Sequence, residues 1–263
     1  MSMRVLDWQE WSERAPDMPT AMTIGVFDGV HQGHQALIAR IVRQGCIPTV
    51  VTFRQNPKRI LAPETYGGDI LSLSQKLALF ETLGVAQTML IDFSGNFSRL
   101  KGREFIDALI SRGKLRYLVI GSNFRCGYRL DMDAALISAL NATRGIRTEV
   151  VPPVREAGVP VSSSRIRRAI QAGDLVQARA ALGRNVVIDL EGIPAVPGAE
   201  GVFFDVASAY RVIPPPGRYR VVLHERGNGV GKTAEIGIED GKIRIPPGDT
   251  AAFHAGCIEF NTP

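Results

Sequence analysis

The sequence predicts an α/β fold: a Rossmann-like domain with a parallel sheet, followed by a small C-terminal antiparallel β-barrel domain. Over residues 1–150, short apolar runs alternate with amphipathic stretches, which is typical of parallel strands connected by helices. After residue 184 the pattern changes to alternating polar and apolar residues, separated by turn signals that contain Gly and Pro. We therefore expect one domain over residues 1–184 and a second over residues 185–263.

The first domain is expected to consist of parallel strands connected by helices. The strands are expected at 21–26, 49–53, 87–92, 117–121 and 147–152, and the helices at 35–44, 74–83, 102–111 and 132–143. Two short helices are expected within residues 163–183. Ligands of such sheets bind at the carboxyl ends of the strands. The loops after residues 26, 53 and 121 are therefore the candidate ligand-binding loops.

The second domain shows strand-like alternation at 217–223 and turn signals at 227–229 and 239–241. Residues 227–233 end like a Walker-type phosphate loop, but Arg226 occupies the position where that loop needs its first glycine. Residues 234–238 are expected to form a strand, whereas a Walker loop is followed by a helix. We therefore predict a β-hairpin turn around Asn228 and Gly229.

The composition limits the class of protein. The 263 residues are 45% hydrophobic and carry a net charge of +5. No apolar run reaches the roughly 18–20 residues of a membrane span, and residues 1–17 lack the apolar segment of a signal peptide. Three widely spaced cysteines favour reduced thiols in the cytoplasm. We expect a cytoplasmic monomer or weak homo-oligomer that binds anionic small molecules rather than nucleic acid or a membrane.

The Gly-rich run at 23–34 is the most informative motif. An apolar strand leads into glycines and then a helical pattern, an arrangement whose free N–H groups and helix dipole bind phosphate. His31 and His34 fall on one face of the first helical turn, which suggests chemistry on a bound polyphosphate. The alternatives are a tight strand–helix connection or half of a metal site. His224 and His254 lie far downstream, so no residue is assigned as a metal ligand.

Three further motifs follow the Gly-rich run. They read Val-Thr-Phe-Arg-Gln-Asn-Pro at 51–57, Val-Ile-Gly-Ser-Asn-Phe-Arg-Cys-Gly at 119–127, and Val-Ser-Ser-Ser-Arg-Ile-Arg at 161–167, with Ala-Leu-Gly-Arg at 181–184. Together the four motifs resemble the prokaryotic FAD synthetases, whose N-terminal module is an FMN adenylyltransferase of the HxGH nucleotidyltransferase superfamily. The resemblance covers roughly residues 20–184 and implies a nucleotidyltransferase fold for the first domain.

The resemblance implies a Mg²⁺-dependent reaction in which ATP and FMN give FAD and pyrophosphate. Its motifs imply catalytic roles for four residues: His31, His34, Asn123 and Arg167. They imply ATP binding by the Gly-rich turn and by a later helix N-terminus: Gly25, Phe27, Asp28, Gly29, Gly33, Ser163 and Ser164. They imply flavin binding by Phe53, Asn56, Pro57 and Phe124. The imidazoles would donate to the phosphates, and the glycines would keep side chains away from the nucleotide.

Simpler roles stay open for several of these residues. Serines at a helix start are often N-caps, and we expect Ser162 to be one. Asn123 would also suit a turn, and Phe53 and Phe124 would also suit the hydrophobic core. Asp28 is expected to order its loop by hydrogen bonding rather than to act as a base.

The fourth motif holds three arginines. A guanidinium makes bidentate contacts to phosphate and keeps its proton. The family motif selects Arg167, together with Ser163 and Ser164, for the β- and γ-phosphates of ATP. Arg165 and Arg168 are expected to be solvated surface residues.

The sequence departs from the family pattern at four positions. They are Arg54 in place of Asp, Asn56 in place of His, Cys126 in place of an aromatic residue, and Ser164 in place of Thr. The first three belong to the presumed flavin side and leave adenylyl transfer intact. We therefore expect the phosphate chemistry to be kept and the flavin pocket to have altered walls.

The C-terminal domain departs further. Bifunctional family members continue into a riboflavin kinase barrel that carries Pro-Thr-Ala-Asn. Residues 185–263 lack that sequence, while residues 214–221 resemble the family's Pro-x-Gly-x-Tyr strand. We therefore expect a monofunctional adenylyltransferase with a degenerate kinase-like barrel. The alternatives are a bifunctional enzyme, a sister nucleotidyltransferase for another phosphate substrate, and an inactive flavin- or nucleotide-binding regulator.

Overall fold

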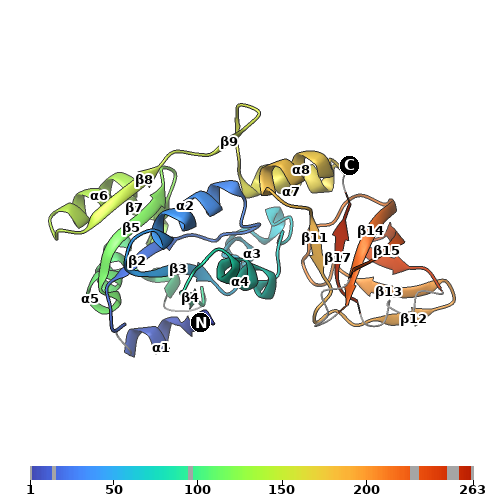
Figure 1. Cartoon of the computed structure of the whole chain (residues 1–263), viewed down its shortest axis with the longest axis horizontal. Helices are drawn as coiled ribbons and strands as arrows, with labels where there is room; N and C mark the ends of the chain where they lie inside the picture. The colour runs from blue at the N-terminus through green and yellow to red at the C-terminus, as the bar shows by residue number, and fades with distance from the viewer. Residues whose placement is uncertain (1, 14–15, 94–96, 226–230, 248–254, 262–263) are drawn as a thin grey trace. The chain divides into compact units, whose positions relative to one another are not determined.

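The computed structural model describes residues 2–13, 16–93, 97–225, 231–247 and 255–261 (Figure 1). The chain divides into two compact units. One comprises Met1–Pro63 and Lys76–Arg155, and the other comprises Glu64–Gln75 and Glu156–Pro263. Each unit is described separately below, and the division into domains at residue 184 stays a prediction. No helix in the described ranges is long and apolar enough to cross a membrane.

The first unit contains a six-stranded sheet in the order β1-β4-β3-β2-β5-β8, and every pair in it is parallel. Its strands are β1 (Arg4–Asp7), β2 (Thr20–Ile24), β3 (Ile47–Phe53), β4 (Gln87–Ile91), β5 (Leu115–Gly121) and β8 (Arg147–Val151). The predicted parallel α/β sheet is confirmed. Strand β1 was not predicted, because it is an edge strand whose four residues are exposed or half-buried and lack an apolar run.

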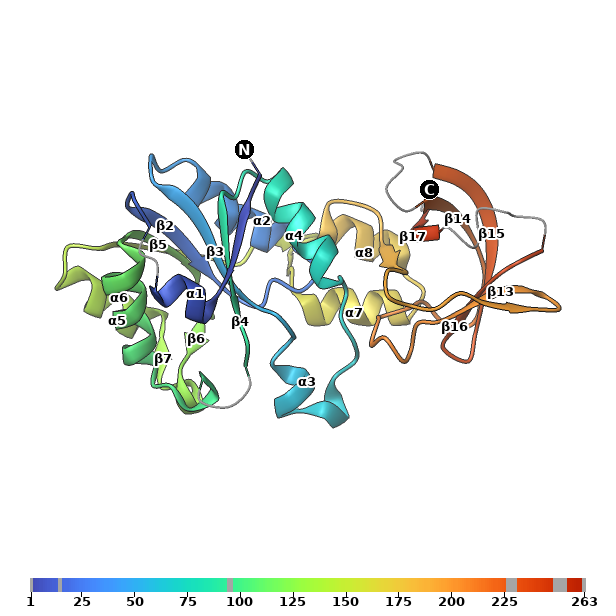
Figure 2. The same cartoon turned by 90° about the horizontal axis from the view of Figure 1, so that it is seen from below.

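Helices cover both faces of this sheet (Figure 2). They are α1 (Trp8–Glu13), α2 (Gln32–Val42), α4 (Leu73–Thr82, which enters this unit at Lys76), α5 (Gly102–Gly113) and α6 (Ala134–Ala142). The short helix α3 (Lys58–Leu61) has no buried residue and lies away from the sheet (Figure 2). Apolar side chains of α1, α5 and α6 pack with the sheet in one hydrophobic core. The helix predicted at 132–143 begins two residues late, because Met132–Asp133 forms β7, paired with β6 (Arg125–Cys126). Asp133 caps α6 by accepting from the Leu136 N–H group.

The order of the strands locates the ligand-binding edge of the first unit. Strand β2 lies between β3 and β5, with Thr23 opposite Val50 on one side and Val119 on the other. The chain leaves β2 toward β3 and later returns to add β5 on the opposite side, which makes this the topological switch point of the sheet. The loops after β2, β3 and β5 therefore leave the same edge, where ligands of such sheets bind.

In the part of the second unit that the structure describes, helices α7 and α8 precede a seven-stranded antiparallel sheet in the order β11-β17-β14-β15-β16-β13-β12 (Figure 1). The helices are α7 (Ser163–Gln171) and α8 (Leu175–Leu182), as predicted, and a ribbon of β9 (Arg155–Glu156) and β10 (Val159–Pro160) precedes them. The strands are β11 (Val187–Asp189), β12 (Val196–Gly198), β13 (Gly201–Asp205), β14 (Gly217–Glu225), β15 (Gly231–Glu239), β16 (Lys242–Ile245) and β17 (Ala255–Phe260). The predicted barrel is therefore a half-barrel.

Two predicted turns of the half-barrel have different outcomes. Asp240 and Gly241 both have positive φ, 48° and 75°, as a two-residue hairpin turn of type I′ requires. The turn predicted at Asn228 and Gly229 lies outside the described residues. Strands β14 and β15, which flank it, pair in antiparallel register, and β15 includes the strand predicted at 234–238.

Candidate active site

The Gly-rich turn after β2 has an unusual backbone. Phe27, Gly29 and Val30 all have positive φ, of 54°, 82° and 37°. This conformation suits glycine, but it is strained for phenylalanine and above all for the β-branched valine, at roughly 1–3 kcal/mol each. Phe27 is 1% exposed and Val30 is fully buried, so packing holds the strained turn in place. Backbone strain of this kind is concentrated at functional sites.

His31 and His34 form a stacked pair at the start of α2. Their ring centroids are 3.6 Å apart and the ring planes differ by 18°. His31 is the N-cap residue of α2, but its side chain makes no capping hydrogen bond and is only 6% exposed. The prediction that the two imidazoles share one face of the first turn is confirmed. The pair lies where the helix dipole is positive, which suits a bound phosphate.

Two glycines of the motif leave room for aromatic rings of the protein itself. A Cβ atom on Gly25 would lie 3.3 Å from the Phe27 ring, and one on Gly33 would lie 3.2 Å from the His31 ring. The Phe27 ring in turn makes an edge contact with His34, at 5.0 Å between centroids. The glycines therefore permit this arrangement of rings, and their predicted role beside a nucleotide stays a prediction.

The loop after β5 leaves the same edge of the sheet. Asn123 is exposed, and the N–H group of Phe124 donates to the Gly121 carbonyl at 2.9 Å, which closes a tight turn. Phe124 and Cys126 are half-buried against the hydrophobic core. Burial, reinforced by the carboxylate of Asp131, raises the pKa of the Cys126 thiol to about 12.

The loop after β3 carries the predicted flavin-side residues. Phe53 is half-buried and contacts Phe97 and Phe93 with ring centroids 6.4 and 5.7 Å apart, so it is part of the packed interior at this edge. Asn56 is 8% exposed, and its Oδ1 accepts from the Lys58 N–H group at 3.2 Å. Pro57 is the N-cap residue of α3. These positions suit apolar walls, and their contact with a flavin stays a prediction.

The second unit holds the serines and arginines of the fourth motif. Ser162 caps α7 by accepting from the Arg165 N–H group, which confirms the predicted N-cap. Ser163 is half-buried and Ser164 is exposed. The Nε atom of Arg167 donates to the Gly68 carbonyl at 2.8 Å. The binding of ATP by Ser163, Ser164 and Arg167 stays a prediction.

One expectation for the fourth motif is wrong. Arg165 is not a solvated surface residue: its side chain is 14% exposed and pairs with the Glu156 carboxylate. Its guanidinium also donates to the main-chain carbonyls of Glu156 and Val159. Arg165 therefore fixes the β9–β10 ribbon to α7, whereas Arg168 is exposed as expected. This ion pair joins residues nine positions apart across the β9–β10 ribbon, so helical or strand periodicity does not predict it.

Comparison with known proteins identifies the family. A family model described as FAD synthetase matches residues 13–165, which include the Gly-rich turn and the loops after β3 and β5. The chain belongs to the FAD synthetase family. Relatives include proteins named bifunctional riboflavin kinase/FMN adenylyltransferase. The one from Pseudomonas fluorescens is 30% identical over 236 residues, covering 85% of this chain and 76% of the relative.

Two further matches are a second relative and a solved structure. The protein of the same name from Escherichia coli K12 is 29% identical over 180 residues, which cover 66% of this chain and 58% of that relative. A solved structure titled macrolide-efflux protein, from Streptococcus pneumoniae, has a TM-score of 0.79 and 21% identity, and covers 98% of this chain and 89% of that one. This structural likeness shows the fold alone.

Among the described residues of this FAD synthetase family member, no group of three or more His, Cys, Asp or Glu side chains could hold a metal ion. Stacking also directs the faces of His31 and His34 toward each other. Magnesium is commonly bound through substrate phosphates with one or two protein oxygens. The binding of Mg²⁺ by this protein stays a prediction.

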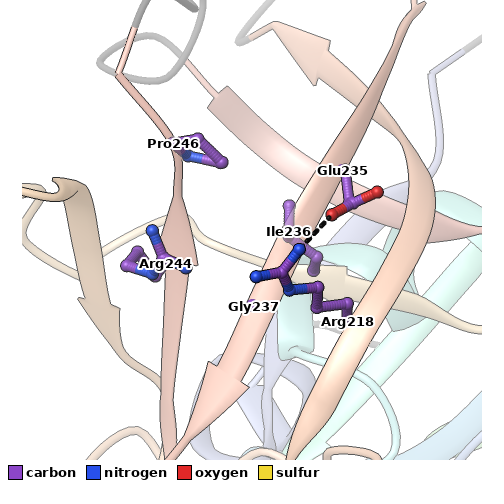
Figure 3. Close-up of a pocket in the computed structure, with 6 residues that line it drawn as sticks. All are labelled: Arg218, Glu235, Ile236, Gly237, Arg244 and Pro246. Carbon is purple, nitrogen blue, oxygen red and sulfur yellow. Dashed lines mark ion pairs between the residues drawn. The ribbon is translucent and has the colours of Figure 1, made fainter.

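The half-barrel of this family member carries a small basic pocket of about 190 Å³ (Figure 3). Arg218 and Arg244 lie on either side of Gly237, which pairs with both of them in adjacent strands. Arg218 forms an ion pair with Glu235 at 3.6 Å, and both side chains are mostly exposed. An exposed ion pair of this kind contributes little to stability.

Lys76 lies at the same edge as the Gly-rich turn and is not among the predicted site residues. It is 8% exposed, and its ammonium group donates to the Phe53 carbonyl at 2.9 Å. The available signal was its spacing: Lys76 stands four residues before Phe80, on the buried face of α4. A lysine on the apolar face of a helix indicates a specific polar partner.

Proposed function

We propose that this protein is an FMN adenylyltransferase, which transfers AMP from ATP to FMN and releases pyrophosphate. The observation that carries the proposal is the stacked pair of buried His31 and half-buried His34 at the N-terminus of α2, beside the switch point of the sheet. Membership of the FAD synthetase family supports the choice of substrates. We further propose that it acts in the cytoplasm, as a monomer or weak homo-oligomer.

The reaction places specific demands on the site. A phosphate oxygen of FMN forms a bond to the α-phosphorus of ATP, and the bond from that phosphorus to the bridging oxygen breaks. Negative charge develops on the departing pyrophosphate and on the equatorial oxygens. Catalysis therefore consists of alignment and charge stabilisation. His31 and His34 supply N–H donors toward this charge, and the first turn of α2 adds its free N–H groups.

Magnesium would neutralise charge on the triphosphate when bound. We assign Asn123 a catalytic role beside the reacting phosphates, because its exposed side chain lies two residues after the end of β5. Asp28 is 6% exposed, and we assign it to ordering the turn. The glycines and Phe27 shape that turn around the nucleotide.

Two further groups of residues complete the proposed assignment. Ser163, Ser164 and Arg167 are assigned to the β- and γ-phosphates of ATP, because hydroxyls and a permanently charged guanidinium suit these anions. The flavin is assigned to apolar and amide side chains near the ends of β3 and β5: Phe53, Asn56, Pro57 and Phe124. Substitutions at Arg54, Asn56 and Cys126 relative to the family pattern alter the walls of this part of the site.

We propose that the protein lacks riboflavin kinase activity, since residues 185–263 contain no Pro-Thr-Ala-Asn sequence. A bifunctional enzyme is the second candidate. The match to the Pseudomonas fluorescens relative favours it, since that match covers 85% of this chain.

One incubation tests both activities. The protein is given ATP, Mg²⁺ and either FMN or riboflavin, and the products are separated by chromatography. We expect FAD from FMN and no FMN from riboflavin. Formation of FMN from riboflavin would replace the proposal with the bifunctional one. Activity only with phosphopantetheine or nicotinamide mononucleotide in place of FMN would assign the protein to a sister reaction.

A further inference from the structure

Lys76 joins the ends of two neighbouring strands in the first unit. Its Nζ atom donates to the Phe53 carbonyl at 2.9 Å, to Thr52 Oγ1 at 3.3 Å and to the Val26 carbonyl at 3.4 Å. Phe53 is the last residue of β3, and Val26 lies two residues beyond the end of β2. One buried ammonium group therefore connects the Gly-rich turn with the loop that carries the proposed flavin-side residues.

A second hydrogen bond strengthens the same connection. Thr52 Oγ1 donates to the Val26 carbonyl at 3.1 Å while it accepts from Lys76. Burial of an ammonium group is unfavourable unless hydrogen bonds compensate it. The three oxygens that accept from Lys76 come from the strand ends, so the lysine stays buried only while those ends keep their positions.

Helix α4 also contacts the Gly-rich turn through a residue one helical turn after Lys76. Phe80, four residues after Lys76, makes an edge contact with Phe27 at 5.6 Å between ring centroids. Phe27 contacts His34 at 5.0 Å, and His34 stacks on His31. Side chains at i and i+4 of α4 therefore hold two consecutive residues of the turn, Val26 and Phe27.

We propose that Lys76 is a positioning residue, which sets the place of the His31–His34 pair relative to the loop after β3. The expected effect of Lys76 on the reaction rate rests on the proposed function. Adenylyl transfer requires the FMN phosphate and the α-phosphorus in line, and a displacement of about 1 Å reduces such rates by about 100-fold. Loss of the ammonium group therefore lowers the rate of adenylyl transfer by displacing the His31–His34 pair relative to the loop after β3.

The test replaces Lys76 by methionine, which keeps a long unbranched side chain without donors or charge. We expect Lys76→Met to lower kcat for FAD formation at least about tenfold, with KM for ATP and FMN changed by less than about threefold. Lys242→Met is the matched control, because Lys242 is an exposed lysine of β16 in the second unit. A folded Lys76→Met protein with wild-type kcat would overturn the proposal.

A structural readout separates this inference from the proposed function. The imidazole C–H resonances of the four histidines can be assigned by NMR with single His→Ala variants. Lys76→Met should shift the resonances of His31 and His34 and leave that of His224 in place, whereas Lys242→Met should leave His31 and His34 unchanged. Unshifted His31 and His34 resonances in Lys76→Met would refute the positioning role even if the protein makes no FAD.

Thr52→Val provides a second variant in case Lys76→Met fails to fold. It preserves the shape of the fully buried Thr52 side chain and removes only the hydroxyl from the connection. We expect it to shift the His34 resonance and to lower kcat by about threefold. If folded Thr52→Val shows neither the resonance shift nor the lower kcat, the proposal is overturned. The double variant should show less than the sum of the single effects, because both act through one connection.

Discussion

The imidazole rings of His31 and His34 stack with their centroids 3.6 Å apart and 18° between their planes. Stacked rings present their edges side by side, so N–H groups of both residues can be directed at one polyphosphate. The same stacking brings ring faces, not nitrogen lone pairs, toward each other. We propose that the pair stabilises charge on a bound polyphosphate. The first prediction tests that proposal, and the others test the packing and electrostatics of the fold.

Removal of the His31 ring should reduce the rate of adenylyl transfer. His31→Ala is expected to lower kcat for FAD formation at least about 100-fold, because a preorganised donor to the developing charge is lost. Steady-state kinetics measure the effect. The control is His224→Ala, which removes an imidazole paired with Glu259 in the half-barrel. A near-wild-type rate for His31→Ala would remove this histidine from the mechanism.

Gly33→Ala should separate stability from activity. Gly33 lies within α2, where alanine is favoured over glycine by roughly 0.5–1 kcal/mol. The new methyl group would stand 3.2 Å from the His31 ring and displace it by a few tenths of an ångström. We expect an unchanged or higher Tm together with a kcat reduced about tenfold. An unchanged kcat in this variant would show that the exact placement of the ring is unimportant.

Two arginines of α7 should respond differently to the same substitution. Arg165→Met removes the ion pair with Glu156 and is expected to lower Tm by about 3–6 °C, with kcat maintained at temperatures below unfolding. Arg167→Met is expected to raise KM for ATP at least about tenfold with a smaller change in Tm. Calorimetry and kinetics on the two variants provide the comparison. The opposite pattern would exchange the structural and functional roles of the two residues.

Two cysteines should be poor nucleophiles in the folded protein. Burial raises the pKa of Cys126 to about 12 and that of Cys257 to about 11. At pH 8 only about one in ten thousand Cys126 side chains would be thiolate. Iodoacetamide labelling, followed by mass spectrometry, should modify both cysteines far more slowly in the native protein than in urea. Labelling of native Cys126 at the denatured rate would contradict the packing described for its loop.

Glu149 should make stability depend on pH. The Tyr117 hydroxyl, and then Arg40, hold the pKa of Glu149 below its ordinary value of 4.5. Because the folded pKa is the lower one, the stabilisation is complete well above pH 4.5 and is lost as pH falls through the folded pKa. Glu149→Gln is therefore expected to lower Tm by about 2–4 °C at pH 7. The difference should shrink as pH falls below 4.5 and through the folded pKa, and a difference that stays constant with pH would refute this account.

Local sequence patterns predicted most of the parallel sheet, because β2, β3 and β5 are buried strands with near-continuous apolar runs. The position of His31 and His34 followed from the same logic, since a helix begins directly after a Gly-rich turn. The positive φ of Phe27 and Val30 was not predictable, because packing against distant residues imposes it on side chains that disfavour it.

Long-range contacts explain the remaining differences. Lys76 is an ordinary lysine in a helical pattern until β2 and β3 provide its acceptors. Arg165 is an ordinary surface arginine until Glu156 folds back onto α7. Segment Glu64–Gln75 belongs to the second unit although it lies between β3 and β4 in the chain, and the backbone of Asp69 forms a parallel β-bridge with that of Arg211 there. None of these contacts has a periodic or short-range signature.

The most direct measurement of the central claim is the formation of FAD from FMN and ATP by the purified protein with Mg²⁺. The proposed function predicts one pyrophosphate released for each FAD formed, and a loss of both products in His31→Ala. Chromatography and a pyrophosphate assay on the same samples measure the two quantities. Absence of FAD with wild-type protein that binds ATP, or FAD formation undiminished in His31→Ala, would contradict the account.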